Sequence, residues 1–535
     1  MSSLLKFDII IRNGSIFDGT GSRPFTADMG LAGDRIAAIG DLEQAVADQV
    51  LDINNLAVCP GFIDTHAHSE FTLLADPRAA AKILQGVTTE INGNCGLSGG
   101  PLLGAYAERR EDDLKELGIR ERWQSLEEYF SILERRSPAL NFKTLVGHGN
   151  IRGAVVGYAD RPATETELAR MKSLLRTALF QGACGLSTGL IYPPGVYSDL
   201  DELADLASEV ALSGGIYATH MRSESDDVVQ AVSEALEIGA RGSIPVHISH
   251  LKTAGRTNWN KIDKIFSLMS NSISKGHKVT CDRYPYVAGS TDLDALLPAW
   301  VYEGGAGAEM DRLRNDAVVE RIRNEMGTEI MGDDYWKDVR VSSVSRDENI
   351  WMQGLDMLAV SRRLNKKPFD AYIEVLLDER LRAGGIFFGM SQENLKRILT
   401  KNYTMVGSDA SARCFDGITA SGHPHPRAFG TFPKFLGYYS RDLQLMPFAE
   451  AVRKITSLPA EVFRIQGRGR IYEGAYADLV IVDPGSVKDR ATFEKPFLPS
   501  DGILHVFVNG LQVVKNGSLT EVRPGRILRG YTGNA

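Results

Sequence analysis

Short apolar runs alternate with amphipathic helical patterns through the long middle of this chain, from about residue 61 to residue 459. The strand-like runs lie at 145–147, 185–187, 216–219, 246–249, 278–281 and 405–407, and helical patterns lie among them at 164–181, 200–213 and 226–238. Parallel strands need a crossover connection, and a helix is the usual one. Alternation over about 400 residues therefore predicts an α/β fold, a (β/α)8 TIM-like barrel with insertions.

Both ends of the chain have strand-like patterns instead. An Asn-Gly pair at 13–14 separates two short apolar runs, and a second pair at 509–510 separates two more. Asn and Gly tolerate the positive φ angles of a type I′ turn, so each pair predicts a β-hairpin. Another strand-like run lies at 477–482. Two all-β ends around a long middle predict that the termini join in one small β-sandwich domain.

These patterns give a provisional domain map. We expect the small β domain to comprise residues 1–60 and 465–535, and the barrel to comprise residues 61–464. The charged, helix-forming segment 310–338 predicts a small insertion at about 300–345.

Composition excludes several classes of partner. A formal net charge of -8 and a pI near 5.8 give no attraction to polyanions, so nucleic acid is not expected. No stretch approaches the roughly 20 apolar residues that a membrane span needs, and the first residues lack the pattern of a signal peptide. The cysteines number five and are scattered, which argues against a disulfide framework and favours the reducing cytoplasm.

Several side chains that can bind a metal follow separate apolar runs of the middle segment. They are His66, His68, Cys95, His220, His250 and Asp409. Each has an ordinary explanation alone, since short His-x-His matches are frequent and a lone cysteine is usually a small buried residue. Active sites of βα-barrels, however, lie at the carboxyl ends of the strands. Imidazole with thiolate is a donor set typical of zinc, so together these residues predict a zinc site.

The other histidines carry weaker predictions. His247 should point away from the site by strand parity and is interpreted as structural. His148 is equally compatible with a site role and a loop role. His277, His423 and His505 support no functional prediction.

The motifs also carry a resemblance to a known family. The segment 61–68, Gly-Phe-Ile-Asp-Thr-His-Ala-His, resembles the first-strand signature of the amidohydrolase superfamily, and 477–484 with 508–510 resemble its terminal β domain. Further motifs are similar, in the same order, to the N-acyl-D-amino-acid deacylases, or D-aminoacylases. They are Gly-Val-Thr-Thr at 86–89, Gly-Asn-Cys-Gly at 93–96, Gly-Leu-Ser-Thr-Gly-Leu-Ile-Tyr-Pro-Pro-Gly at 185–195, His-Met-Arg at 220–222, Ile-Ser-His-Leu-Lys at 248–252, Tyr-Pro-Tyr at 284–286, Gly-Ser-Asp at 407–409 and Pro-His-Pro-Arg at 424–427.

The resemblance implies a particular set of metal ligands. A tightly held zinc would use Cys95, His220 and His250, and a second, weaker metal position would use His66, His68 and Asp409. Many amidohydrolases bridge two metals with a carboxylated lysine of the fourth strand, but the matching segment 183–187 has no lysine. Its absence indicates the cysteine-type subgroup and leaves Cys184 as a buried residue.

The resemblance also implies catalytic and substrate-binding roles. Asp409 would be the general base that deprotonates water and then protonates the leaving amine. Lys252, Tyr284 and Arg427 would bind the α-carboxylate of the substrate, and Tyr192 would place a hydroxyl near the acyl group. Residues 410–423 are longer than the family pattern, which leaves open how Arg427 reaches the site.

Two alternatives remain at this point. A cyclic-amide hydrolase of the hydantoinase or dihydroorotase type would share fold and metal chemistry, and a non-catalytic zinc-binding scaffold would share the ligands. Asp292, Asp294 and Trp300 are expected to line the side-chain pocket. With no arginine evident nearby, they argue against acidic D-amino acids. Oligomeric state and acyl-chain preference are left open.

Overall fold

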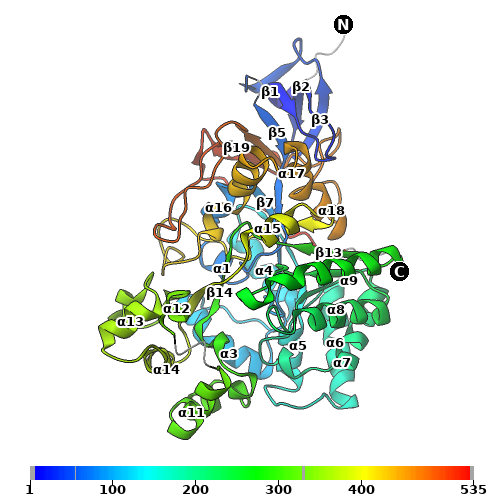
Figure 1. Cartoon of the computed structure of the whole chain (residues 1–535). Helices are drawn as coiled ribbons and strands as arrows, with labels where there is room; N and C mark the ends of the chain where they lie inside the picture. The colour runs from blue at the N-terminus through cyan, green and yellow to red at the C-terminus, as the bar shows by residue number, and fades with distance from the viewer. Residues whose placement is uncertain (1–5, 55, 328–331, 531–535) are drawn as a thin grey trace.

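The computed structural model describes residues 6–54, 56–327 and 332–530 (Figure 1). Residues 1–5, 55, 328–331 and 531–535 belong to the expected β domain and insertion and lie outside the described residues. In Figure 1 the blue N-terminal and orange-red C-terminal strands gather at one end of the molecule, and helices α11–α14 lie at the other end.

Parallel strands form the centre of the molecule. They are β6 (Phe62–Asp64), β7 (Val87–Asn92), β8 (Asn141–Thr144), β9 (Val146–Gly147), β10 (Gly185–Gly189), β11 (Ile216–His220), β12 (Val246–Ile248), β13 (Val279–Asp282) and β17 (Thr404–Met405). They pair in the orders β6-β7-β8 and β9-β10-β11-β12-β13-β17. Only Leu145 separates β8 from β9, so these two share one strand position. A parallel bridge between Ala67 and Ala410 joins the first strand position to the last. This closed parallel arrangement confirms the predicted α/β barrel architecture.

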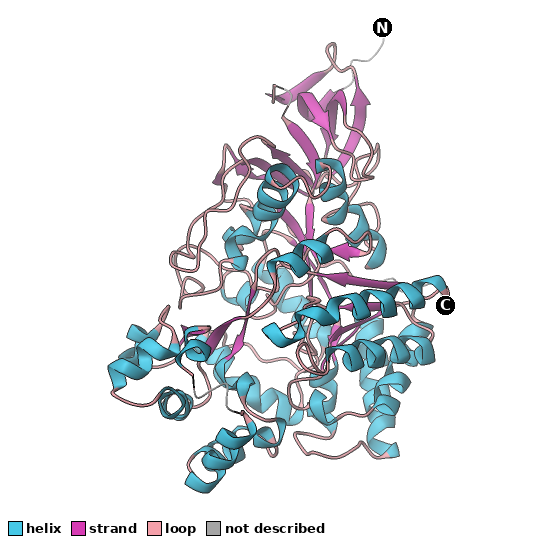
Figure 2. Ribbon diagram, viewed as in Figure 1, coloured by secondary structure: helices cyan, strands magenta, loops and turns pink. Residues whose placement is uncertain are grey.

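Helices cover the outside of these strands, as the ribbons of Figure 2 show. They include α2 (Ala80–Ile83), α4 (Leu126–Arg136), α6 (Glu165–Gln181), α7 (Leu200–Leu212), α8 (Val228–Gly242), α9 (Ile262–Ser274), α15 (Gln392–Leu399), α16 (Arg427–Lys434), α17 (Phe448–Lys454) and α18 (Ser457–Val462). Helix α6 begins where the Thr164 hydroxyl accepts from the Glu167 backbone, as in a capping box. In α8 the buried residues Val228, Ala231, Val232 and Ala235 recur with helical spacing, which fixes its inner face.

Strands from both chain ends form one sheet. They are β1 (Lys6–Ile16), β2 (Phe25–Ala32), β3 (Arg35–Gly40), β4 (Val46–Asp52), β5 (Ala57–Pro60), β18 (Leu479–Val482), β19 (Ile503–Val508), β20 (Leu511–Lys515) and β21 (Ser518–Leu519). Strand β18 pairs with both β5 and β19, which joins the two ends of the chain.

The two Asn-Gly pairs have different outcomes. Asn509 and Gly510, both at positive φ, connect β19 to β20, which confirms that hairpin. The hairpin predicted at Asn13 is wrong, because β1 runs on past it and pairs with β2 on both sides. Asn13 has φ 57, and the register shifts between Ile11 and Gly14, so the positive φ makes an irregularity within one strand instead of a turn.

A further layer follows β13. Strands β14 (Ala288–Asp292), β15 (Val339–Ser343) and β16 (Gly384–Phe388) form a sheet in the order β14-β16-β15. The accompanying helices are α10 (Ala306–Leu313), α11 (Asp316–Glu325), α12 (Asp333–Lys337), α13 (Met357–Leu364) and α14 (Pro368–Asp378). Their hydrophobic core runs from Leu293 to Ala383 and is separate from that of the barrel. The inserted layer is therefore longer than the expected 300–345, because β14 and β16 pair across the whole segment.

In the ranges that the structure describes, no helix has the length and apolar character needed to cross a membrane.

Candidate metal centre and active site

The side chains predicted to bind a metal come from different strand ends of the barrel. His66 and His68 follow β6, Cys95 follows β7, His220 ends β11, His250 follows β12 and Asp409 follows β17. Each of these residues lies at the end of a buried strand or in the loop that follows it, at one end of the barrel. The closed barrel thus brings together residues that lie far apart in the sequence.

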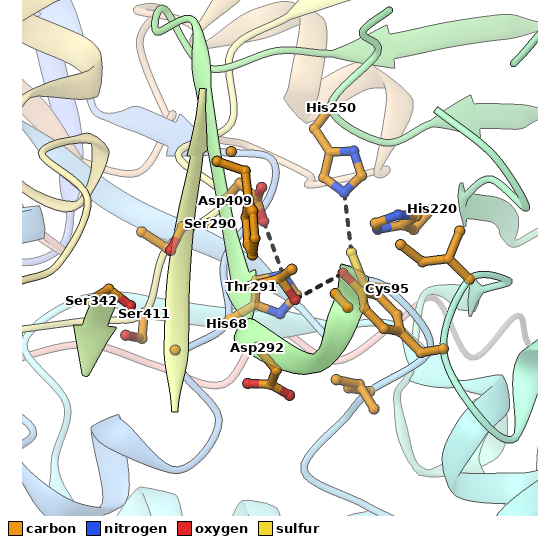
Figure 3. Close-up of a pocket in the computed structure, with 18 of the residues that line it drawn as sticks. His68, Cys95, His220, His250, Ser290, Thr291, Asp292, Ser342, Asp409 and Ser411 are labelled. Carbon is orange, nitrogen blue, oxygen red and sulfur yellow. Dashed lines mark hydrogen bonds and ion pairs between the residues drawn. The ribbon is translucent and has the colours of Figure 1, made fainter. Parts of the chain in front are cut away.

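Cys95 is the centre of this cluster. Its Sγ lies 3.3 Å from His66 Nε2 and 3.4 Å from His250 Nε2. Two groups share it: His66, His68, Cys95 and Asp409 form one, and Cys95, His220 and His250 form the other, each with ligand atoms within 4.8 Å of one another. Figure 3 shows the side chains of Cys95, His220 and His250 directed toward one another, with His68 and Asp409 beside them.

Backbone geometry at three of these positions is unusual. Cys95, His250 and Asp409 have φ angles of 53, 35 and 51 degrees, in the left-handed region that non-glycine residues seldom adopt. Gly93 and Gly96 flank Cys95, and a Cβ on Gly93 would lie 2.1 Å from the Leu145 backbone oxygen. Non-glycine residues persist in such conformations where the surrounding structure holds them, and they concentrate at functional sites.

The residues fit a zinc ion chemically. His220 is only 4% exposed, yet neither of its ring nitrogens has a hydrogen-bond partner among the described residues. Burial raises the pKa of the Cys95 thiol, but the His66 and His250 rings outweigh burial and hold that pKa well below its usual value. A thiolate with free imidazole nitrogens is the donor set that zinc prefers.

Two carboxylates, Asp282 and Glu224, contact the ring nitrogens of His66 and His250 that do not face Cys95. The sequence motifs did not single out these carboxylates. Asp282 Oδ2 lies 3.2 Å from His66 Nδ1, and Glu224 Oε1 lies 2.9 Å from His250 Nδ1. Burial and the nearby Lys252 lower the pKa of His250, but Glu224 and other anions raise it to about 9. Asp282 ends β13, so its strand-end position was a usable signal, whereas Glu224 lies in a loop without one.

Asp409 links the metal cluster to a cation. Its Oδ1 lies 3.3 Å from His68 Nε2, and its Oδ2 lies 2.7 Å from Arg427 Nη1. Burial raises the pKa of the Asp409 carboxyl, but Arg427 and His250 hold it well below its usual value. The carboxyl is therefore ionised at neutral pH, as a proton acceptor must be.

The residues expected to bind a carboxylate also lie together. The guanidinium of Arg427 lies 4.6 Å from the Tyr284 ring centroid, and Lys252 Nζ lies 5.9 Å from it. The buried Tyr284 hydroxyl has no hydrogen-bond partner among the described residues. The long segment 410–423 does not keep Arg427 from the site. His425 positions this arginine by accepting from its backbone nitrogen at 2.9 Å.

Tyr192 lies on the other side of the cluster, with its ring 5.0 Å from that of His220. Its hydroxyl lies 3.0 Å from Thr291 Oγ1 on the inserted layer.

A buried ion cluster of Lys82, Asp64 and Glu90 lies next to the strand ends that carry the site. Lys82 Nζ lies 2.6 Å from Asp64 Oδ2 and 2.9 Å from Glu90 Oε1, with all three side chains inaccessible to solvent. Lys82 also donates to the Ser408 hydroxyl and the Ala410 backbone, next to Asp409. It thereby ties the first strands of the barrel to the last.

Most of the predicted site residues line one cavity of about 680 Å³, together with barrel loops and the inserted layer, whereas His66, Asp282 and Lys82 do not line it. Asp292 and Asp294 line it as expected, but Trp300 does not. Trp300 instead donates to Glu325 at 2.6 Å. The expectation of no nearby arginine is also wrong, because Arg109 and Arg110 of α3 (Gly104–Glu116) line the same cavity. These two arginines lie far from Asp292 and Asp294 in the sequence, so no sequence pattern connected them to the pocket.

The remaining candidates have structural surroundings. His148 Nε2 lies 2.8 Å from Glu202 Oε1, is fully buried and does not line the cavity. His247 Nε2 lies 2.7 Å from Asp282 Oδ2, so it supports the carboxylate that holds His66. Cys184 lies outside both metal-binding groups.

Comparisons with known proteins agree with this arrangement. The sequence model described as Amidohydrolase family matches residues 49–514. The D-aminoacylase of Alcaligenes xylosoxydans xylosoxydans is 36% identical over 528 residues, with 98% of this chain and 97% of that protein covered. The N-acyl-D-glutamate deacylase of the same organism is 36% identical over 526 residues, with coverage of 98% and 97%.

Solved structures give the same result. The crystal structure of N-acyl-D-glutamate deacylase from Bordetella bronchiseptica, complexed with zinc and a phosphonate that mimics the tetrahedral intermediate, superimposes with a TM-score of 0.83. The two sequences are 33% identical, and the match covers 98% of this chain and 100% of that one. With the fold and the full-length similarity in agreement, this chain belongs to the amidohydrolase family.

Proposed function

We propose that this protein is a zinc-dependent amidohydrolase that cleaves the amide bond of N-acyl-D-amino acids, releasing a carboxylate and a free D-amino acid. The observation that carries the proposal is the double contact of Asp409, which joins the metal-binding histidines to Arg427. One cavity then contains metal donors, a carboxylate base and a receptor for the substrate's own carboxylate. The D configuration rests on the relatives named D-aminoacylase and N-acyl-D-glutamate deacylase.

Cys95, His220 and His250 would hold one zinc tightly, and His66, His68 and Asp409 would form a second, weaker position. A structure of D-aminoacylase has been described in terms of one-metal activation and second-metal attenuation, which supports two unequal positions. A bound zinc supplies a Lewis acid and brings the pKa of water toward neutrality.

The chain's own residues would do the rest. Lys252, Tyr284 and Arg427 bind the substrate's α-carboxylate, and this fixes the position of the amide. Asp409 takes a proton from the attacking water and delivers it to the amine nitrogen as the C–N bond breaks. Tyr192 donates its hydroxyl near the acyl group.

The test uses zinc-loaded protein with matched N-acetyl-D and N-acetyl-L forms of methionine, leucine, phenylalanine and glutamate. Amine release is followed while bound zinc is quantified. Release from D forms alone is expected. Release from L forms at an equal rate would refute the stereochemical assignment.

The two alternatives give different results in the same experiment. A cyclic-amide hydrolase would leave every linear substrate intact and would open hydantoin or dihydroorotate. A non-catalytic scaffold would bind zinc and turn over neither class. The open donor set argues against the scaffold, because structural zinc sites close with four ligands and no spare base.

We also infer that residues 1–60 and 465–535 are a β-sandwich domain beside a barrel of residues 61–464. The pairing of β18 with β5 supports this division. The cytoplasmic location and the lack of nucleic-acid partners stay predictions.

A further inference from the structure

The cavity that starts at the predicted metal-binding residues also reaches two acidic side chains, Asp292 and Asp294. Together with the buried Glu309, which is not among the lining residues, they are here called the acidic end. Asp292 and Asp294 line the cavity, and Figure 3 shows Asp292 next to Thr291 at the end of β14. Glu309 on α10 acts electrostatically on both. The acidic end belongs to the inserted layer, whereas the metal donors belong to the barrel.

The carboxyl groups of the acidic end lack partners. Asp294 is 7% exposed, and no other described side chain hydrogen-bonds to its carboxylate. Glu309 is 1% exposed, and its Oε1 has no hydrogen-bond partner among the described residues. Asp292, at the end of β14, is exposed, and Arg109, Arg110 and Arg382 act on it electrostatically. Buried carboxylates without partners are costly, so the cavity is incomplete at Asp294.

The nearby cations are mostly occupied. Arg110 Nη1 lies 2.9 Å from Asp113 Oδ2, and Arg382 Nη2 lies 3.0 Å from the other oxygen of the same carboxylate. Arg109 is left, with its guanidinium 5.5 Å from the Tyr158 ring centroid. Of these three arginines, Arg109 is thus the one without a carboxylate partner among the described residues. It acts electrostatically on all three carboxyls of the acidic end, which outnumber it.

The electrostatics of the carboxyls agree with this shortage. Burial, and then Asp292 and Glu309 as like charges, raise the pKa of Asp294 well above its usual value. Burial raises the pKa of Glu309 to about 7, although Arg109 opposes this. A cation entering the cavity would stabilise the ionised forms.

The inserted sheet links the acidic end to the residues that would bind the α-carboxylate. Arg427 Nη2 donates to the Ser290 backbone oxygen at 3.0 Å, and Asp292 lies two residues further along the same strand. Two residues of strand span about 7 Å, and side chains at i and i+2 lie on one face. In the described sheet β14 pairs with β16 alone, so its other edge is free to line the cavity. A substrate whose α-carboxylate meets Arg427 can therefore direct a long side chain toward Asp292.

Building on the proposed deacylase activity, we propose that the acidic end recognises a cationic side chain, so that the preferred substrates are N-acyl derivatives of D-lysine and D-arginine. Lysine carries its ammonium on a flexible four-carbon stem, and arginine presents a fork of donors suited to carboxylates. Acidic side chains would meet the like charges of Asp292 and Asp294, which outnumber Arg109, the one of these arginines that is not paired with Asp113.

The test compares kcat/KM for N-acetyl-D-lysine, N-acetyl-D-arginine, N-acetyl-D-norleucine and N-acetyl-D-glutamate on the zinc-loaded full chain. Norleucine matches the lysine stem but lacks the ammonium group. We expect lysine to exceed norleucine by roughly ten- to a hundredfold, the range of one charge-assisted hydrogen bond. Norleucine or glutamate equal to or better than lysine would overturn the proposal.

Variants locate the effect. Asp292→Asn should lower kcat/KM for lysine about tenfold more than for norleucine, since the charge is one part of the recognition. Asp311→Asn, an exposed acidic position on the same inserted layer, is the matched control and should leave the lysine-to-norleucine ratio unchanged. An unchanged ratio in Asp292→Asn would also overturn the proposal. If no N-acetyl-D-amino acid is hydrolysed, the deacylase function itself fails, and this outcome is distinct from a changed ranking.

Discussion

Replacing Asp409 with Asn tests the assigned general base with little change of shape. The amide cannot accept the proton from water, and a general base typically contributes about a hundred- to ten-thousandfold to the rate. At about 1.36 kcal/mol per tenfold change, the expected fall in kcat/KM corresponds to a loss of roughly 2.7 to 5.4 kcal/mol of transition-state stabilisation. The change also removes the anion 2.7 Å from Arg427. Loss of a buried ion-pair partner costs about 3 to 5 kcal/mol, and we expect the lower figure because Arg427 keeps its bond to Ser290.

The assay measures amine release from N-acetyl-D-methionine, zinc content and thermal unfolding on the same preparation. Cys95, His220 and His250 are unchanged, so about one zinc per chain should remain. Asp416→Asn is the matched control, because that side chain is 74% exposed on the same segment and pairs with Arg78 away from the metal donors. A folded, zinc-loaded Asp409→Asn protein with kcat/KM within about threefold of the parent would refute the reasoning.

Three further predictions follow from other parts of the structure. Cys95→Ser removes the sulfur that both metal-binding groups share, so zinc measured after dialysis should fall toward zero, and retained zinc would contradict the ligand assignment. Lys82→Met leaves two buried carboxylates without their cation and should cost about 3 to 5 kcal/mol in denaturant unfolding, whereas Lys115→Met at an exposed site should cost little. The pKa of Glu202 is held below 4.5, since His148 and an arginine outweigh burial, so its stabilisation is full above pH 4.5 and is lost as pH falls below that value. Glu202→Gln should therefore flatten the acid limb of unfolding free energy against pH, and an unchanged slope would refute this.

Much of the barrel could be predicted from local patterns. The apolar runs expected at 185–187, 216–219 and 246–249 became β10, β11 and β12 with shifts of one or two residues. Period and capping are local properties, so they can be seen in a short window. The Asn13 hairpin failed for the same reason, because the choice between a turn and an irregular strand depended on pairing with β2.

The clustering of the predicted metal donors could be anticipated because each lies at the end of a strand or in the loop after it. Residues whose roles depend on contacts between distant segments could not be predicted in this way. Glu224 lies in a loop, and its role is visible only where it contacts His250. Arg109 belongs to a helix almost 200 residues before Asp294, and no sequence pattern joins the two.

The sequence by itself determined the alternation of strands and helices, the set of candidate metal donors and the family to which the motifs point. The tertiary structure alone decided that Cys95 is shared by both groups of donors, that Arg427 reaches Asp409, and that Arg109 faces the acidic end. The physical reason is that periodicity and capping act over a few residues, whereas these contacts form when the barrel closes and the inserted layer folds over it. Their distances depend on how distant segments pack, which no local pattern encodes.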